Sequence, residues 1–204
     1  MKLTIKDGLS PTLRSLVECL EGSARGELHQ AMGVEVQELT AAHLRNLAAT
    51  RHDTANRLGA APSNHLAQAA EKVAAPGALE ADTGAATLSI DHVGMVRALR
   101  DVTIAPRGAK ALAIPVHALA YNRRPRQFGA EAFFVYVNKT TGDAFLARRQ
   151  ENKGDRPLLM YLLVRSVTQK QDRTLLPSDQ EFSEAAGRGA LGYLRQALQA
   201  GGNL

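Results

Sequence analysis

The fold is decided by one stretch of sequence, which reads Glu131-Ala-Phe-Phe-Val-Tyr-Val-Asn138, Lys139-Thr-Thr-Gly142, Asp143-Ala-Phe-Leu-Ala-Arg-Arg149 and, after a charged break, Leu158-Leu-Met-Tyr-Leu-Leu-Val-Arg-Ser-Val-Thr168. Aromatic and β-branched residues concentrate in these runs, which is typical of strands. Glycine at the end of the tetrad predicts the positive φ that closes a short hairpin loop of the type I plus bulge kind. Asn152-Lys-Gly-Asp155 marks the next junction, so the stretch predicts an antiparallel meander.

Helices are predicted on the N-terminal side of this meander. The first begins at Ser10-Pro11 and ends at Gly22, with serine as N-cap and proline at the first helical position. Residues 26–32 are expected to form a break or a weakly helical bridge. A second helix follows from Gly33 to about Arg51, then loop sequence to Pro62. A third helix over residues 64–74, capped by Ser63, carries a stripe of small buried residues: Leu66, Ala69, Ala70 and Val73.

The remaining segments complete an α+β plan. Residues 85–91 and 110–117 are predicted strands. Proline cannot donate to a ladder, so Pro115 marks the second as an edge strand or as the end of a strand. Residues 94–107 are expected to form a turn with a short helical piece. Pro177-Ser178 opens a last helix with a Ser178–Glu181 capping box. Its buried face is predicted to contain Phe182, Ala186, Ala190, Leu194 and Leu198.

The chain of 204 residues is therefore predicted to be a single α+β domain, in which about four antiparallel strands pack with N-terminal helices and a C-terminal helix. Residues 1–76 are mainly helical, 85–168 form the sheet and 178–200 the last helix. Aromatic residues make up only 4% of the chain, so the core should be aliphatic and alanine-rich. No apolar run is long enough to span a membrane and no apolar signal core is seen, so we expect a cytoplasmic site of synthesis. The single cysteine, Cys19, excludes an internal disulfide.

Basic residues gather in the middle of the chain, which carries a net charge of +5. One acid, Asp101, stands among seven cationic residues that form the candidate site for a partner or for DNA: Arg97, Arg100, Arg107, Lys110, Arg123, Arg124 and Arg126. A rim of this kind suits nucleic acid or an acidic protein surface. A solvated loop whose charges only keep the protein soluble is the alternative.

Three sequence patterns resemble a nucleotide-binding, a metal-binding or a catalytic site, but the surrounding sequence argues against each of them. Gly187-Arg-Gly-Ala-Leu-Gly192 matches a dinucleotide-binding fingerprint, but it lies inside the last predicted helix and not after a strand, so close helix packing explains it better. The histidines lack metal-ligand spacing, and His43 is expected to be a satisfied interior or interface residue. Ser89, Asp91 and His92 are neighbours in sequence only. We therefore predict no enzyme activity, no cofactor and no metal.

Several segments resemble, in order and spacing, the virion morphogenesis (tail-completion) family of Mu-like and related tailed phages. They read Gly94-Met-Val-Arg97, Val102-Thr-Ile-Ala-Pro-Arg107, Ala109-Lys-Ala-Leu-Ala-Ile-Pro115, the hairpin over 134–148, Leu159-Met-Tyr-Leu-Leu-Val-Arg-Ser-Val-Thr168 and Leu176-Pro-Ser-Asp179. The N-terminal helices fit more loosely. The chain departs from the family at Arg100-Asp101-Val102, where members tend to carry a double glycine, so a less tight turn is expected there.

The resemblance implies a structural protein of the virion, found in the neck or tail. Such proteins act as rings, commonly sixfold, between the head connector and the tail, or finish the tail end. The implied partners are further copies of the chain, neighbouring connector and tail proteins, and DNA in the lumen. A basic nucleic-acid-binding module is the alternative. Against it, only Tyr121 and Phe128 offer stacking surfaces among the arginines, and no recognition helix is legible.

Overall fold

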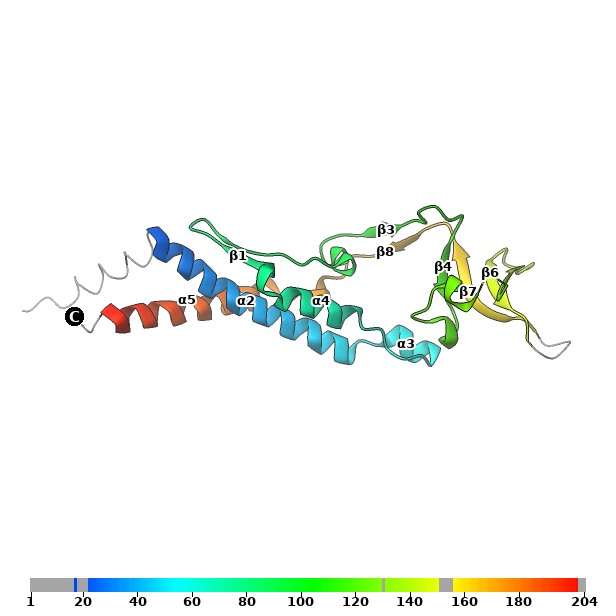
Figure 1. The fold of residues 1–204 in the computed structure, drawn as a ribbon, viewed down its shortest axis with the longest axis horizontal. Helices are drawn as coiled ribbons and strands as arrows, with labels where there is room; N and C mark the ends of the chain where they lie inside the picture. Colours follow the sequence, from blue (N-terminus) through cyan, green and yellow to red (C-terminus); the bar gives the residue numbers. More distant parts are fainter. Residues whose placement is uncertain (1–16, 18–21, 130, 151–155, 202–204) are drawn as a thin grey trace, which may run out of the picture. The chain divides into compact units, whose positions relative to one another are not determined.

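The computed structural model describes residue 17 and residues 22–129, 131–150 and 156–201, and it has the predicted α+β fold (Figure 1). The predicted helix before Gly22, Cys19 and the turn at 152–155 lie outside the described residues. The chain forms two compact units. The first contains residues 22–47, 66–95 and 174–201, and the second contains residues 48–65 and 96–173 as far as they are described. The expectation of a single domain stays a prediction.

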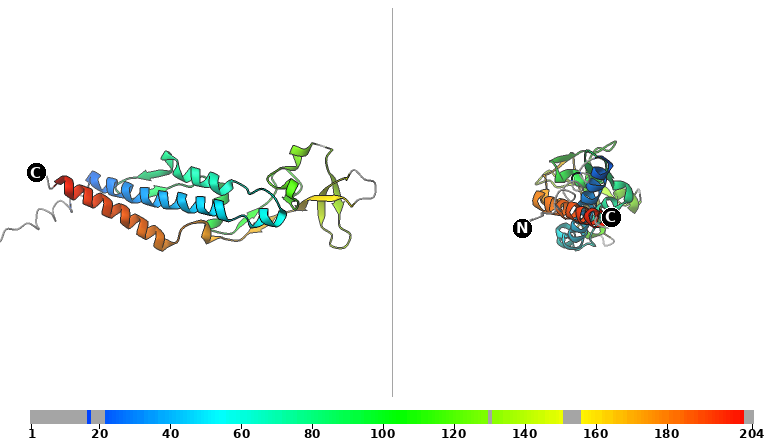
Figure 2. Two further views of the ribbon diagram at one scale, coloured as in Figure 1. Left: turned by 90° about the horizontal axis from the view of Figure 1, so that it is seen from below. Right: turned by 90° about the vertical axis from the view of Figure 1, so that its left-hand side faces the viewer.

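The first unit is built on two long helices, α2 (Gly22–Thr50) and α5 (Asp179–Gly201), which lie side by side in Figures 1 and 2. Their side-chain contacts run in opposite order along the two sequences. Arg188 Nε lies 3.5 Å from a carboxylate oxygen of Glu35, and Tyr193 donates its hydroxyl to Glu27 at 3.1 Å. The two helices are therefore antiparallel.

The predicted break between residues 26 and 32 is wrong, because α2 runs through it without interruption. Gly33 is a position of close approach, whereas a side chain on Gly26 would make only ordinary contacts. A Cβ on Gly33 would lie 2.6 Å from Leu79 Cδ1, and one on Gly26 would lie 3.6 Å from the backbone of Asp82. His29, between the two glycines, hydrogen-bonds the Asp82 carbonyl through Nδ1 at 2.7 Å. Gly33 thus makes room for a hairpin on this face of the helix.

That hairpin consists of β1 (Leu79–Ala81) and β2 (Ala86–Leu88), paired antiparallel with Leu79 opposite Leu88. Only its second strand was predicted. Helix α4 (His65–Ala74) begins one residue later than expected and buries all four residues of its predicted stripe. Gln37 of α2 donates to the Val73 carbonyl at 2.7 Å. Alanines supply half of the buried apolar residues of the described chain, as the composition predicted.

Helix α5 begins with the predicted capping box. The Ser178 backbone N–H and hydroxyl each donate to Glu181 Oε2 at 2.7 Å, and the Glu181 N–H donates to Ser178 Oγ at 3.3 Å. These bonds favour the ionised carboxylate, so the Ser178 N–H first and its hydroxyl second lower the pKa of Glu181, with a smaller contribution from nearby His43. Because the pKa is lowered on folding, this contribution to stability is complete above the unfolded pKa and is lost as the pH falls through the folded one.

We expect Ser178→Ala to raise the pKa of Glu181 part of the way back to its ordinary value, because the hydroxyl donor is lost while the backbone donor remains. Titration of the Glu181 carboxyl by NMR measures the change. Ser183→Ala is the matched control, since the Ser183 hydroxyl donates to the Asp179 carbonyl and does not touch Glu181. A Glu181 pKa that is unchanged in Ser178→Ala would show that the serine hydroxyl does not act on this carboxylate.

The second unit contains a four-stranded antiparallel sheet in the order β4-β7-β6-β5. Its strands are β4 (Leu112–Pro115), β5 (Phe134–Val137), β6 (Ala144–Arg148) and β7 (Leu158–Val164). Strands β5, β6 and β7 form the predicted meander, and β4 adds at one edge, where Pro115 was expected. Gly142 closes the β5–β6 hairpin with a φ of +75°, and its N–H donates to the Asn138 carbonyl at 2.8 Å.

The strand predicted to extend to Thr168 is divided in two. After Val164 the chain leaves the four-stranded sheet, and β8 (Val167–Gln169) pairs instead with β3 (Val102–Ile104) as a separate ribbon. The loop predicted between Arg51 and Pro62 contains a short helix, α3 (Asp53–Leu58), which ends at Gly59 with a φ of +62°. Five short 3-10 helices complete the described chain: η1 (Pro76–Ala78), η2 (Val93–Ala98), η3 (Ala118–Ala120), η4 (Pro125–Phe128) and η5 (Arg173–Leu175).

The core of the four-stranded sheet is centred on Tyr161, which has no exposed surface. Its ring meets Phe133 and Phe128 edge-on, with centroids 5.8 Å and 6.4 Å away, and those two rings meet at 5.4 Å. The Tyr161 hydroxyl donates to the Arg123 carbonyl at 3.0 Å. Burial raises the pKa of Tyr161, and the nearby Arg123 guanidinium opposes the rise. Three of the few aromatic residues of the chain thus form the centre of this core.

Candidate partner-contact surface

The seven predicted basic residues all belong to the second unit, but they have different surroundings. Arg97 is half-buried in η2. The other six are exposed, and they follow η2, lie in the β3–β4 connection, or lie just before or within η4: Arg100, Arg107, Lys110, Arg123, Arg124 and Arg126. The structure therefore leaves six of the seven accessible to a partner and assigns the seventh to the fold.

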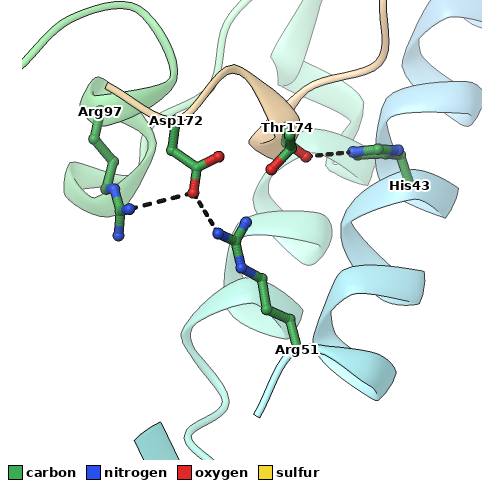
Figure 3. A network of polar contacts seen from close by, with 5 residues as sticks. All are labelled: His43, Arg51, Arg97, Asp172 and Thr174. Carbon is green, nitrogen blue, oxygen red and sulfur yellow. Dashed lines mark hydrogen bonds and ion pairs between the residues drawn. The ribbon is translucent and has the colours of Figure 1, made fainter. Parts of the chain in front are cut away.

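Arg97 has a structural role, as Figure 3 shows. Its guanidinium lies 3.2 Å from Asp172 Oδ2, and the same oxygen accepts from Arg51. The Asp172 side chain is only 11% exposed, and its backbone N–H donates to the Arg97 carbonyl at 2.7 Å. One carboxylate thus connects η2, the segment after β8 and the residue that follows α2. The members of this triad are widely separated along the chain, so no local sequence pattern predicts it.

Asp101, the one acid in the basic segment, is also engaged. Its Oδ2 accepts from Lys170 Nζ at 2.9 Å, and its Oδ1 accepts the backbone N–H of Gln171 at 2.7 Å. The lysine first and the N–H second lower the pKa of Asp101, and the same pair raises the pKa of Lys170. These bonds link the start of β3 to the end of β8.

The segment around η4 is held by two hydrogen bonds between Arg124 and Gln127, and neither of them uses an arginine side chain. The Arg124 N–H donates to Gln127 Oε1 at 2.6 Å, and the Gln127 N–H returns to the Arg124 carbonyl at 2.9 Å. The Arg123 guanidinium lies over the Phe128 ring, 5.6 Å from its centroid. Phe128 packs against the buried Tyr161 ring. The core of the sheet therefore holds in place the segment that carries three exposed cationic residues, Arg123, Arg124 and Arg126.

A second accessible surface was not predicted, and it lies on strand β5. Val135 and Val137 are 62% and 53% exposed, although they belong to a sheet. Beside them is a hollow of about 560 Å³ at the start of the strand, whose lining includes Glu131, Arg148 and Arg149. Arg149 lies over the Phe134 ring, 5.8 Å from its centroid. We call residues 133–137 the β5 edge. The high β-propensity of this run was visible in the sequence, but its place at the end of the sheet was not.

Several histidines of the described chain make hydrogen bonds within the fold. His43 Nε2 contacts the Thr174 carbonyl at 3.0 Å, as Figure 3 shows, which agrees with its predicted role as a satisfied residue. His92 and His117 each accept a nearby backbone N–H through Nδ1 at 3.2 Å. Over the residues that the structure describes, no group of three histidine, cysteine or acidic side chains could hold a metal ion. Within the same residues, no helix is both long and apolar enough to cross a bilayer.

Comparison with known proteins adds no family: no family model matches the chain, and neither a curated protein nor a solved structure matches it.

Proposed function

We propose that the chain is a structural component of a tailed-phage virion, a ring-forming neck or tail-completion protein that joins or finishes the tail at the head–tail interface. The observation that carries the proposal is the succession of elements from β4 to α5. An edge strand ending Leu112-Ala-Ile-Pro115 precedes a hairpin, then a strand with Tyr161-Leu-Leu163, then a helix that opens after Leu176-Pro-Ser-Asp179. The same succession underlies the family resemblance.

The surfaces of the second unit suit such a role. Strand β5 lies at an edge of the sheet that no other strand of the described residues covers, and open edges attract further chains. A ring closes when one patch of each subunit meets a different patch of the next, which is the head-to-tail kind of contact. The exposed arginines around η4 supply a cationic face for DNA in the lumen or for an acidic neighbouring ring, with contacts to phosphates that are independent of sequence.

The test is to delete the gene from the phage that encodes it and to image the particles by negative-stain electron microscopy. We expect DNA-filled heads separate from free tails, or tails with abnormal ends, and wild-type protein supplied in trans should restore joined particles. Normal joined particles in the deletion would contradict the proposal. A complementing variant with Arg123, Arg124 and Arg126 reversed to glutamate tests the cationic face separately. If it restores assembly and DNA retention fully, the arginines have no part in either.

The nucleic-acid-binding alternative predicts a different result in solution. Each phosphate contact contributes a counterion-release term, so the affinity of a DNA binder falls steeply as salt rises. Two results together would assign the protein to the nucleic-acid-binding class. Deletion of the gene would leave normal virions, and the purified protein would bind DNA with a steep salt dependence that the triple reversal abolishes.

A further inference from the structure

The hydrogen-bonding direction of strand β5 follows from one bond at its end. The Asn138 N–H donates to the Asp143 carbonyl at 2.9 Å, so Asn138 faces β6. Backbone groups alternate in direction along a strand, so Phe134 and Tyr136 also turn their N–H and C=O groups toward β6. Phe133, Val135 and Val137 therefore turn theirs outward, at the open end of the sheet. The β5 edge offers donors and acceptors to a further strand.

The opposite edge of the same sheet is closed to such pairing. The Val116 N–H donates to the Met160 carbonyl at 2.9 Å, so Val116 faces β7 and its neighbour Pro115 faces outward. Proline has no N–H, and an edge that carries it discourages a further strand. The β5 edge contains no proline, and its exposed valines belong to the residue class that strands prefer. A partner strand therefore has one favourable place on this sheet.

We infer that the β5 edge binds the β5 edge of a second copy of this chain, antiparallel, with Val135 opposite Val135 of that copy. The sheets of the two copies would join across a twofold axis. This contact is isologous and occupies the β5 edge, so the head-to-tail contacts of a ring would use other surfaces of the chain. The inference does not rest on the proposed function. It depends on the direction of the backbone groups and on the fit of the β5 edge to itself.

The fit to itself is good on both faces of the strand. With Val135 opposite Val135 of the second copy, the two valines form a hydrogen-bonded pair and Phe133 lies opposite Val137. Phe134 then lies opposite Tyr136 in a non-hydrogen-bonded pair, where side chains approach most closely and aromatic pairs stabilise a sheet. In this register, the outward backbone groups of Phe133, Val135 and Val137 all face backbone groups of the second copy. The sequence is thus complementary to its own reversed copy.

Charge favours the same alignment. Glu131 precedes the β5 edge and Lys139 follows it, and both are exposed. In an antiparallel pair centred on Val135, each glutamate comes near the lysine of the other copy. The shared ladder is short, with about six backbone hydrogen bonds if each hydrogen-bonded pair exchanges two. We therefore expect a weak, concentration-dependent dimer that covers the exposed faces of Val135 and Val137.

The experiment is sedimentation equilibrium of the full chain with substitutions at the twofold position. Val135→Lys and Val135→Glu place like charges directly opposite each other, so each variant alone should dimerise about fivefold more weakly than wild type. An equimolar mixture of the two should recover the association, because lysine then meets glutamate. Val93→Lys is the matched control, since Val93 is 91% exposed and lies outside the sheet; it should leave dimerisation unchanged.

Recovery in the mixture is specific to a contact in which residue 135 meets itself, and a folding defect in either variant would not produce it. Wild-type protein that stays monomeric at the highest soluble concentration would overturn the inference. So would an association that Val135→Lys leaves intact, or a mixture no stronger than the single variants. Because this readout is taken on purified protein, its failure would leave the virion test untouched, and failure of the virion test would leave the dimer untouched.

Discussion

Gly189→Ala should lower the free energy of unfolding of the first unit by about 1–3 kcal/mol, the usual cost of forcing extra volume into a close-packed site. A Cβ at this position would lie 2.8 Å from both the carbonyl carbon of Ala31 and Met32 Cα, and closer still to the Ala31 oxygen. These are backbone atoms of α2, so no side chain can rotate away. Helices α2 and α5 would have to move apart, which would also weaken the contacts of the buried Ala185.

Two glycines in the same helix provide matched controls. A Cβ on Gly187 or on Gly192 would meet nothing within 4 Å. Because alanine has a higher helix propensity than glycine, Gly187→Ala and Gly192→Ala should each raise the free energy of unfolding by up to about 1 kcal/mol. Urea unfolding followed by far-UV circular dichroism measures all three variants. A Gly189→Ala variant that is stabilised like the controls would show that the helices do not approach closely at this point.

This glycine explains a sequence pattern that suggested a nucleotide site. The run from Gly187 to Gly192 lies inside α5, as predicted, and its middle glycine is the position of closest approach to α2. The predicted buried face of the helix was nearly correct. The deeply buried positions are Ala185 and Gly189, one residue before predicted members of the face, while those predicted members are half-buried. Periodicity located the side of the helix, but it did not show which small residues let the backbones meet.

The elements with strong local signals were predicted well, and the errors have a common cause. The capping box at Ser178, the stripe on α4 and the β5–β6 hairpin depend on residues close together in sequence. The role of Gly33 inside α2 depends on a hairpin some fifty residues away, which uses the space that this glycine leaves. A glycine that faces a neighbour and a glycine that breaks a helix look the same in a single sequence.

The candidate surface shows the same division. The exposed arginines around η4 were identified from composition, whereas the role of Arg97 depends on Asp172, which is 75 residues away in sequence. The β5 edge could not be assigned as an edge from sequence, because the order of strands in a sheet is a tertiary property. Pro115 is the one local signal, because it predicted that its strand is an edge strand or ends there, and β4 does lie at the opposite edge of the sheet.

Tyr161→Ala is expected to lower the free energy of unfolding of the second unit by about 3–5 kcal/mol, the range for removing a large buried aromatic side chain. The ring has no exposed surface, and it holds Phe128 and Phe133 by edge-to-face contacts. Its loss would leave a cavity beneath η4 and release the segment that carries the exposed arginines. Urea unfolding followed by intrinsic tyrosine fluorescence and by far-UV circular dichroism measures the change.

Two further variants separate packing from hydrogen bonding at this site. Tyr161→Phe keeps the ring and removes only the hydroxyl that donates to the Arg123 carbonyl, so it should cost about 1 kcal/mol, the typical net value of one hydrogen bond. Tyr136→Ala removes a tyrosine that is 37% exposed on β5, and it should cost clearly less than Tyr161→Ala. Equal losses for Tyr161→Phe and Tyr161→Ala would mean that the hydroxyl, and not the ring, stabilises the sheet. If the ring dominates, as its burial requires, the stability of η4 comes from the aromatic cluster, and the basic segment is positioned by the core of the four-stranded sheet.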